Sequence, residues 1–321
     1  MSRKPTPGGL EQVRSLLARE RLSIDAMEPG RTCFLSHLGA TKKLVVGPWI
    51  GHRDLLYALA LANLSPDQRT SLGRAVLVEH GREFGVGRVV LTAEDSGLGP
   101  GGSSLHLRPR KSGPTCLYTW ALGKGASPKA CEWLLLRAQP QWALAKPPKP
   151  LTARGVETLN ALDARVVITV ATAVEASQIA TQCLSNVAFS AHPRFAPHVD
   201  ASPRASEEPG GIWLWPHDAL TAESLRKREP QVVILVDAPE ALRTVADRWA
   251  ATLPQAIELT HASCPHRLGR PGLQEFLAAC EQPHVLLRGD PAWVKQGESW
   301  LRERGVTVET QSDATQLGLF V

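Results

Sequence analysis

Three kinds of cluster in this 321-residue sequence could carry chemistry: histidines beside a cysteine, a glycine-rich loop and groups of cations. His261, Cys264 and His266 are close enough to suggest metal ligands, but their spacing matches no standard zinc knuckle. Residues 97–104 are glycine-rich, yet they lack the Lys-Ser/Thr pair of a P-loop and precede a predicted strand. We therefore expect them to form a tight connection rather than a phosphate-binding loop.

The cations are concentrated in the first half of the chain. Residues 1–155 contain 22 Lys and Arg against 11 Asp and Glu, whereas residues 156–321 contain 14 against 20. The two halves therefore carry net charges of +11 and −6. A basic half is typical of a chain that meets phosphates with one face, although uneven solvated charge is also common.

The cysteines and the hydropathy of the sequence indicate the cellular compartment. The six cysteines are scattered without a CxxC pair, so we expect buried free thiols in a reducing cytoplasm. The longest strongly apolar stretch, residues 55–62, is far shorter than the roughly 20 residues that cross a bilayer, and the N-terminus has no apolar signal core. We expect a cytoplasmic protein with no membrane contact and no resident cofactor.

The elements that must position these residues fall into two patterns. The first third contains short β-rich segments separated by turn residues, which predict a mostly antiparallel sheet system, with one helix near residues 52–63. The expected strands are residues 32–36, 44–46, 75–78, 88–92, 104–108 and 115–119. Residues 140–151 contain four prolines, which exclude both helix and central strand and predict a domain boundary.

Beyond that boundary, apolar strands alternate with helices. This alternation predicts a parallel α/β layer, followed by a tail with two more helix–strand units. A surface loop is expected at residues 202–210. The expected strands are residues 165–170, 211–215, 232–236, 284–288 and 306–309, and the expected helices are residues 173–184, 239–251, 271–280 and 292–304.

Several segments, in order, resemble the metallo-β-lactamase fold and its β-CASP nuclease family. Asp25 ends an apolar segment and is followed by residues 33–42, which are similar to the family's strand ending in Ser-His-x-His-x-Asp-His. Residues 83–104 resemble the segment with Pro-Ala-Gly-His-x-x-Gly-Ser-Ala, and residues 117–121 resemble Tyr-Thr-Gly-Asp. Two later segments, residues 258–263 and 284–291, resemble the β-CASP endings Ser-x-His-Ala-Asp and Val-His-Gly-Glu/Asp-Pro.

The resemblance implies an α/β (α+β) protein with a four-layer αββα core and an inserted α/β cap. The implied domains are a first part of the core at 1–152, a β-CASP-like cap at 153–254 and a return to the core at 255–321. In length the chain is most similar to the compact bacterial β-CASP exonucleases associated with DNA ligases, and more distantly to nucleases of mRNA 3′-end processing.

Active relatives use two zinc ions about 3.5–4 Å apart to activate a bridging hydroxide. Of the family's metal-site residues, only Asp25, His37 and His261 match, and Asp95 is the one residue that could replace a missing histidine. We therefore expect no catalytic residues, a vestigial site and no stoichiometric zinc. The alternative for His37 and for His261 is a structural role, as a buried histidine that is hydrogen-bonded within the core. The replaced positions are Gly39, Thr41, Lys42, Ala121, Arg137 and Arg288.

Cations that stand where metal ions would sit preserve attraction for a phosphate backbone while they remove hydrolysis. We predict nucleic-acid contacts from one basic edge that joins the histidine loop to the following hairpin, and a stacking or docking surface at Trp213 and Trp215. The predicted contact residues are Lys42, Lys43, Arg108, Arg110, Lys111, Arg137 and Arg288.

Three functions follow as hypotheses. The first is a non-catalytic, nuclease-like subunit that binds DNA or RNA, or scaffolds an active nuclease, ligase or helicase in DNA repair or RNA processing. The second is a phosphodiester hydrolase with a remodelled, metal-poor site, in which His37 or His261 is the general base and Lys42 or Arg288 stabilises the phosphate. The third is a protein-interaction module without a nucleic-acid role.

Overall fold

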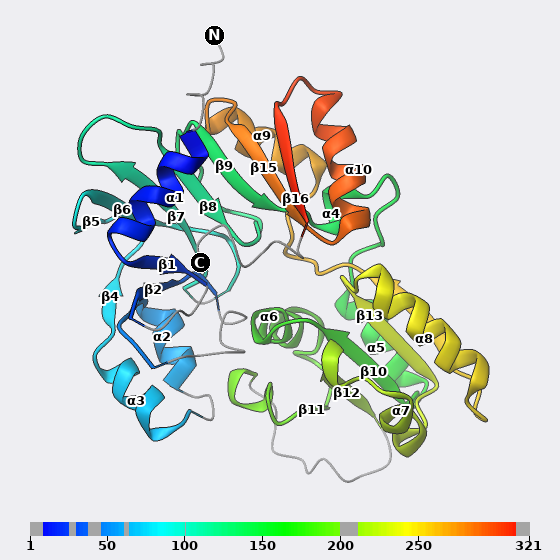
Figure 1. Ribbon diagram of the computed structural model, residues 1–321. Coiled ribbons are helices and arrows are strands. Elements are labelled where there is room, and N and C mark those ends of the chain that lie inside the picture. The colour runs from blue at the N-terminus through cyan, green and yellow to red at the C-terminus, as the bar shows by residue number, and fades with distance from the viewer. Residues whose placement is uncertain are drawn as a thin grey trace. The chain divides into compact units, whose positions relative to one another are not determined.

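The computed structural model describes residues 9–25, 30–37, 46–60, 64–99, 101–199 and 211–312. These residues form a mixed α/β protein with three sheets and helices α1 to α10 (Figure 1). The chain divides into two compact units, the first made of Met1–Ala145 with His266–Val321 and the second of Lys146–Pro265.

The second unit is thus inserted into the first, and it is longer than the 153–254 segment expected from the sequence. Strand β14 (Glu258–Ala262) accounts for the difference at one end, because it pairs with β13 (Val232–Val236). At the other end, Leu151 donates its N–H to the Ser263 carbonyl at 2.9 Å. The expected return to the core at residue 255 is therefore corrected to residue 266.

The smaller sheet of the first unit has the order β1-β2-β3-β4, and all of its strands are parallel. The prediction of antiparallel strands is wrong here: all three pairs are parallel, and between β3 and β4 the helices α2 (Arg53–Ala60) and α3 (Pro66–Gly73) form the crossover that a parallel pair requires. Of the strand expected at 44–46, residues 44 and 45 lie outside the described residues. The strands are β1 (Leu22–Ile24), β2 (Thr32–Leu35), β3 (Trp49–His52) and β4 (Val76–Val78).

The larger sheet of the first unit has the order β16-β15-β9-β8-β7-β6-β5. Strands β5 to β8 are antiparallel, as the sequence predicted, whereas β8, β9, β15 and β16 are parallel. The strands are β5 (Glu83–Val86), β6 (Val89–Asp95), β7 (Ser103–Pro109), β8 (Cys116–Thr119), β9 (Trp133–Arg137), β15 (His284–Gly289) and β16 (Val308–Ser312).

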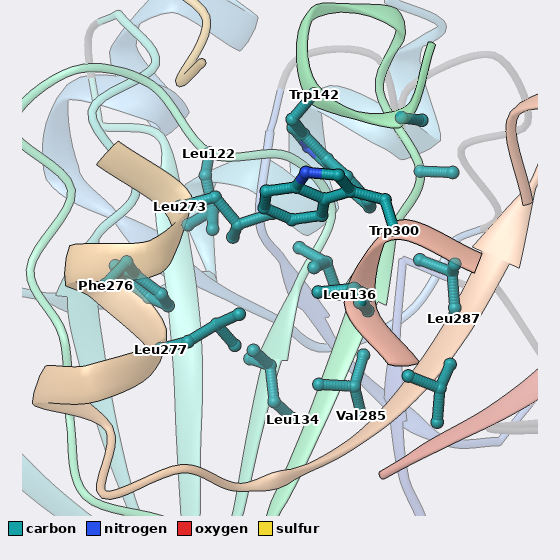
Figure 2. Packing of buried hydrophobic residues seen from close by; sticks show 14 of the residues in the cluster. Leu122, Leu134, Leu136, Trp142, Leu273, Phe276, Leu277, Val285, Leu287 and Trp300 are labelled. Atoms are coloured by element: carbon teal, nitrogen blue, oxygen red, sulfur yellow. The ribbon is translucent and has the colours of Figure 1, made fainter. Parts of the chain in front are cut away.

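Alternating side chains bury both faces of the larger sheet. On β9, Trp133 and Leu135 pack with the smaller sheet and with α1 (Gly9–Arg19), whereas Leu134 and Leu136 pack beneath the outer helices. Figure 2 shows this outer cluster, where Trp142 and Trp300 lie with ring centroids 6.2 Å apart. The outer helices are α4 (Pro140–Ala143), α9 (Arg270–Ala279) and α10 (Pro291–Arg302).

Helix α2 covers the opposite face of the smaller sheet. A Cβ on Gly51 would lie 3.4 Å from the Leu56 side chain, on the face away from Ile50, which packs between the sheets.

The second unit is a five-stranded parallel sheet in the order β11-β12-β10-β13-β14, so the predicted parallel α/β layer is confirmed. Its central strands β10 and β13 are buried along their whole length, and helices pack in separate clusters on the two faces. The surface loop expected at 202–210 lies outside the described residues. The remaining elements are β10 (Val166–Val170), β11 (Phe189–Ala191), β12 (Ile212–Pro216), α5 (Ala153–Ala161), α6 (Ala173–Cys183), α7 (Ala222–Arg228) and α8 (Glu240–Thr252).

Across the described ranges, we find no helix with the length and apolar character needed to cross a membrane.

Candidate functional site

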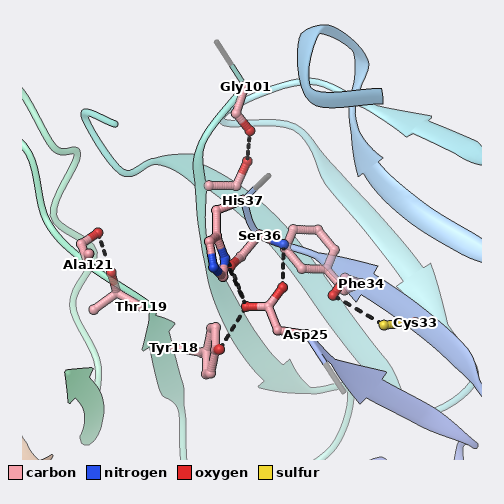
Figure 3. A network of polar contacts seen from close by, with 10 residues as sticks. Asp25, Cys33, Phe34, Ser36, His37, Gly101, Tyr118, Thr119 and Ala121 are labelled. Carbon is pink, nitrogen blue, oxygen red and sulfur yellow. Dashed lines mark hydrogen bonds and ion pairs between the residues drawn. The ribbon is translucent and has the colours of Figure 1, made fainter. Parts of the chain in front are cut away.

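Asp25 is the centre of a buried polar network at the carboxyl end of β1 (Figure 3). Its backbone is left-handed, with φ 54°, a conformation that aspartate tolerates better than most residues. The carboxylate accepts hydrogen bonds from the Ser36 N–H at 2.7 Å, from the Ser36 hydroxyl and from the Tyr118 hydroxyl at 2.7 Å. The ends of β1, β2 and β8 are thereby joined by one carboxylate.

His37 directly follows Ser36 and is buried beside the same carboxylate. Its Nδ1 lies 2.8 Å from the Ser36 hydroxyl oxygen and 3.5 Å from Asp25 Oδ2. The ring stacks on Trp120, with centroids 4.4 Å apart and planes 18° apart. Among the described residues its buried Nε2 has no hydrogen-bond partner, so this atom can still bind a ligand or a proton.

Two arginines lie on the other side of Trp120. Arg137 on β9 and Arg288 on β15 are register partners on adjacent parallel strands. The guanidinium carbon of Arg137 lies 4.2 Å from the Trp120 ring centroid, and that of Arg288 lies 4.8 Å from the Tyr118 centroid and 5.7 Å from that of Trp120.

Arg288 is 5% exposed, and its Nε and Nη2 have no hydrogen-bond partner in the described part of the chain. The Cys116 thiol lies close enough for the guanidinium to affect its titration.

The electrostatics leave this site with an excess of positive charge. Burial raises the pKa of Asp25, but attraction to His37 and hydrogen bonds from His37 and Ser36 outweigh it, so the pKa is lowered overall. Burial raises the pKa of the Tyr118 hydroxyl and of the Cys116 thiol, against the opposing effect of Arg288, so both stay protonated at neutral pH. The described part of the site therefore contains one ionised carboxylate, that of Asp25, and two guanidinium groups, those of Arg137 and Arg288.

Protein donors contact both oxygens of the Asp25 carboxylate. At the position predicted for a lost aspartate, Ala121 is buried and offers only its carbonyl, which accepts from the Thr119 hydroxyl at 3.1 Å. Within the described ranges, no group of three or more His, Cys, Asp or Glu side chains is arranged to hold a metal ion. Zinc content stays a prediction.

Asp95 lies at the end of β6, where its Oδ1 accepts the Gly97 N–H at 2.8 Å and so caps the glycine-rich turn. The loop is a tight connection before a strand, as expected: a Cβ on Gly97, whose φ is +69°, would lie 2.7 Å from the Lys124 carbonyl oxygen. No recorded contact among the described residues joins Asp95 to His37.

Arg108, Arg110 and Lys111 lie at or beyond the end of β7 that is away from the Asp25 network, and a basic edge shared with Lys42 and Lys43 stays a prediction. The N-terminal end of β7 is near the network, since the Ser103 N–H donates to the Ser36 carbonyl at 2.8 Å. Seven strand residues then separate the two ends by about 20 Å. The sequence does not reveal this separation, because it depends on the direction of β7. Lys42 and Lys43, with Gly39 and Thr41, lie outside the described residues.

His261 belongs to the second unit, where it lies on β14 opposite Leu235 of β13. Burial and Arg243 lower the pKa of His261, against the opposing effects of Asp247 and Glu240. Its electrostatic neighbours thus lie on α8. Among the described residues, Asp25, His37, Arg137 and Arg288 of the predicted set lie around Tyr118 and Trp120 in the first unit.

The predicted aromatic surface of the second unit is only partly exposed. Trp213 is buried, whereas Trp215 is half-buried between the Arg228 guanidinium, at 4.1 Å, and the His192 ring, at 4.5 Å. These polar neighbours leave Trp215 less available for stacking than its sequence position suggested.

Sequence reasoning missed Ser36, Tyr118 and Trp120 as parts of the site. The available signal was Trp120 itself, which stands where the resembled Tyr-Thr-Gly-Asp motif has glycine. A bulky aromatic residue at a glycine position indicates a local change of packing.

No protein-family model matches the sequence, and no curated protein matches it. Among solved structures, the chain is similar to a protein of unknown function from Enterococcus faecalis V583, with 13% sequence identity and a TM-score of 0.48. The match covers 83% of this chain and 80% of that chain. A likeness of this degree carries no argument about activity.

Proposed function

We propose that this chain is a non-catalytic protein of the metallo-β-lactamase and β-CASP nuclease type, which binds the phosphate backbone of DNA or RNA without cutting it. In this proposal the first unit is the four-layer αββα core and the second unit is the inserted cap. The observation that carries the proposal is the buried Arg288 guanidinium beside Tyr118 and Trp120, whose Nε and Nη2 have no hydrogen-bond partner within the described ranges.

The fold assignment is supported by where the motif-like residues lie. Asp25, His37, Trp120 and Arg288 come from segments far apart in the sequence, yet they converge at the carboxyl ends of β1, β2, β8 and β15. Each segment was matched to a family motif on sequence grounds alone. Their convergence is what a shared ancestral site requires.

The binding function follows from the cost of an unpaired buried cation. Removing a guanidinium from water costs several kcal/mol unless charge and hydrogen bonds compensate. A hydrogen bond with the Tyr118 side chain and aromatic contacts with Tyr118 and Trp120 compensate only in part, since a cation–π contact contributes about 0.5–2 kcal/mol and Nε and Nη2 have no partner among the described residues. A phosphate oxygen that accepts from Nε and Nη2 would supply the missing hydrogen bonds and the counter-charge.

A second candidate is the metal-poor hydrolase, which is favoured by the unpaired Nε2 of His37. A general base must reach the proton it removes, and this nitrogen is free to do so. Turnover of DNA or RNA that persists with chelator and is lost in His37→Ala would replace the binding-only proposal.

The test is binding of a fluorescent oligonucleotide, as DNA and as RNA, over a series of salt concentrations. A charge-assisted hydrogen bond contributes about 1.5–3 kcal/mol, so Arg288→Gln should weaken binding by about ten- to a hundredfold and lower the salt dependence by about one phosphate contact. The matched control is Arg82→Gln, which removes a charge from an exposed turn and should change affinity less than about twofold.

Arg137→Gln provides a second probe of the site if Arg288→Gln fails to fold. Equal binding by the wild type and by both folded site variants would refute the proposed site. Binding that does not respond to salt would instead favour a protein-interaction module, since protein docking need not release counterions.

Two zinc ions per purified chain would refute the absence of the metal centre. Co-purification of an intact nuclease, ligase or helicase would extend the proposal to a scaffold.

A further inference from the structure

A cavity of about 580 Å³ lies in the first unit, between α1 and the turns at one end of strands β5 to β7. It is lined by the α1 face that includes Val13, Leu16 and Arg19, by Arg88 of the β5–β6 turn, and by residues 109–114. These residues lie at the end of β7 opposite to the Asp25 network. The cavity is therefore separate from the site described above.

Among the described residues, this cavity is lined by four cations and by no Asp or Glu; the cations are Arg19, Arg88, Arg110 and Lys111. No ion pair is recorded for any of the four within the described part of the chain. Their neighbours differ, since Arg108 pairs with Glu83 at 3.1 Å and Arg14 pairs with Glu11 at 3.1 Å.

Like charges gathered around one cavity repel each other, and a ligand with several negative charges would relieve that repulsion. The carboxylate of Glu20 packs against Gly87 of the neighbouring turn and is not among the lining residues. The four lining cations therefore outnumber the Glu20 carboxylate, and the described lining of the cavity keeps a positive net charge.

The cavity also has an apolar wall. Val13 and Pro114 are buried, and Leu16 and Pro109 are half-buried beside them. A volume of this size is in the range of small-molecule sites, which are about 300–1,000 Å³. A ligand that combines a polyphosphate with a flat, partly apolar group would fit both the cations and this wall.

The position of Arg110 depends on a glycine. A Cβ on Gly85 would overlap the Arg110 guanidinium, so that guanidinium lies directly against the β5 backbone. The Arg110 N–H also donates to the Arg88 carbonyl at 2.9 Å, which ties the two cationic turns together.

We propose that this cavity binds a nucleoside polyphosphate, with Arg19, Arg88, Arg110 and Lys111 holding the phosphates and the apolar wall contacting the nucleoside. The proposal does not depend on nucleic-acid binding at Arg288. It assigns a small-molecule site to a part of the chain that the sequence interpretation treated as a nucleic-acid contact.

Calorimetric titration with ATP, ADP, tripolyphosphate and adenosine tests the proposal. ATP should bind with a Kd of about 1 mM or tighter, and more tightly than tripolyphosphate or adenosine. The double variant Arg110→Gln, Lys111→Gln should weaken ATP binding at least about tenfold, which corresponds to about 1.4 kcal/mol. Gly85→Val keeps every charge but displaces Arg110, so it should weaken binding in the same direction.

Two controls separate this cavity from other basic positions. Arg108→Gln removes the neighbouring, ion-paired arginine, and Arg288→Gln removes the arginine of the first site; both should leave ATP affinity unchanged. The proposal is overturned if ATP does not bind, if tripolyphosphate binds as tightly as ATP, or if folded Gly85→Val and the double variant bind like the wild type. Loss of oligonucleotide binding in Arg288→Gln with intact ATP binding would leave both proposals standing independently.

Discussion

Asp25→Asn tests how the first site is held together. The carboxylate accepts two hydrogen bonds from Ser36 and one from Tyr118, and it lies 3.5 Å from His37 Nδ1. Hydrogen bonds to a charged group contribute about 1.5–3 kcal/mol each, but burial of the charge offsets a large part of their sum. An amide keeps the shape and one acceptor, so we expect the free energy of unfolding to fall by about 2–4 kcal/mol at neutral pH.

The free energy of unfolding should depend on pH in a direction that follows from the pKa of Asp25. The pKa of Asp25 is lowered in the folded protein, so the folded state holds the charged form more strongly than the unfolded state does. The added stability is complete above the unfolded value of about 3.9 and is lost as pH falls through the folded pKa. The stability difference between wild type and Asp25→Asn should therefore be constant from about pH 5 to 7 and shrink below about pH 4.

Urea unfolding at several pH values measures this difference. Tyr118→Phe, which removes one of the three bonds, should cost about 1–2 kcal/mol. Glu11→Gln removes an exposed carboxylate paired with Arg14 and should stay within about 0.5 kcal/mol of the wild type. A difference for Asp25→Asn below about 0.5 kcal/mol, or one equally large at pH 3 and pH 7, would refute the reasoning.

Three further predictions concern the core of the first unit. Trp142 is fully buried, so Trp142→Ala should lower the free energy of unfolding by about 3–5 kcal/mol in urea, whereas the exposed Leu162→Ala should change it little. Gly297→Ala should be destabilising although alanine favours a helix by about 1 kcal/mol, because the added Cβ would lie 2.9 Å from Trp142 Cζ3; a variant more stable than the wild type would contradict this. Burial and Lys129 lower the pKa of His106 to about 4, so the unfolded state takes up a proton first and stability falls as pH drops from about 6.5 to about 4. An NMR titration of the His106 ring with a midpoint near its ordinary value would refute that shift.

Sequence pattern predicted the second unit well because its strands are fully apolar. Residues 166–170 and 232–236 are buried on both faces of a parallel sheet, and such strands read as continuous apolar runs. The short strands β1 to β4 have three or four residues each, and periodicity over so few residues does not distinguish parallel from antiparallel pairing. Strand β3 also contains Gly51 and His52, which hid it from a search for apolar segments.

The sequence predicted the site only where the order of the motifs along the chain indicated which residues lie together. Asp25 and His37 were expected to lie together because a strand end and a following loop carry them, and their hydrogen bonds to Ser36 follow from that adjacency. The pairing of Arg137 with Arg288 depends on the register of two strands on either side of the inserted unit. Register between distant segments is set by tertiary packing, so no local pattern reports it.

Trp120 explains how two cations persist where the resembled motifs have metal ligands. Its indole lies between the His37 ring and the Arg137 guanidinium, and the Arg288 guanidinium is within 5.7 Å of it. A glycine at this position would leave a void and would remove the aromatic face that the Arg137 guanidinium contacts, and both effects would destabilise the fold. Trp120, Arg137 and Arg288 therefore depend on one another for their packing. The buried Arg288 guanidinium, whose Nε and Nη2 have no partner in the part of the chain that the structure describes, is the physical basis for proposing that the site binds an anion.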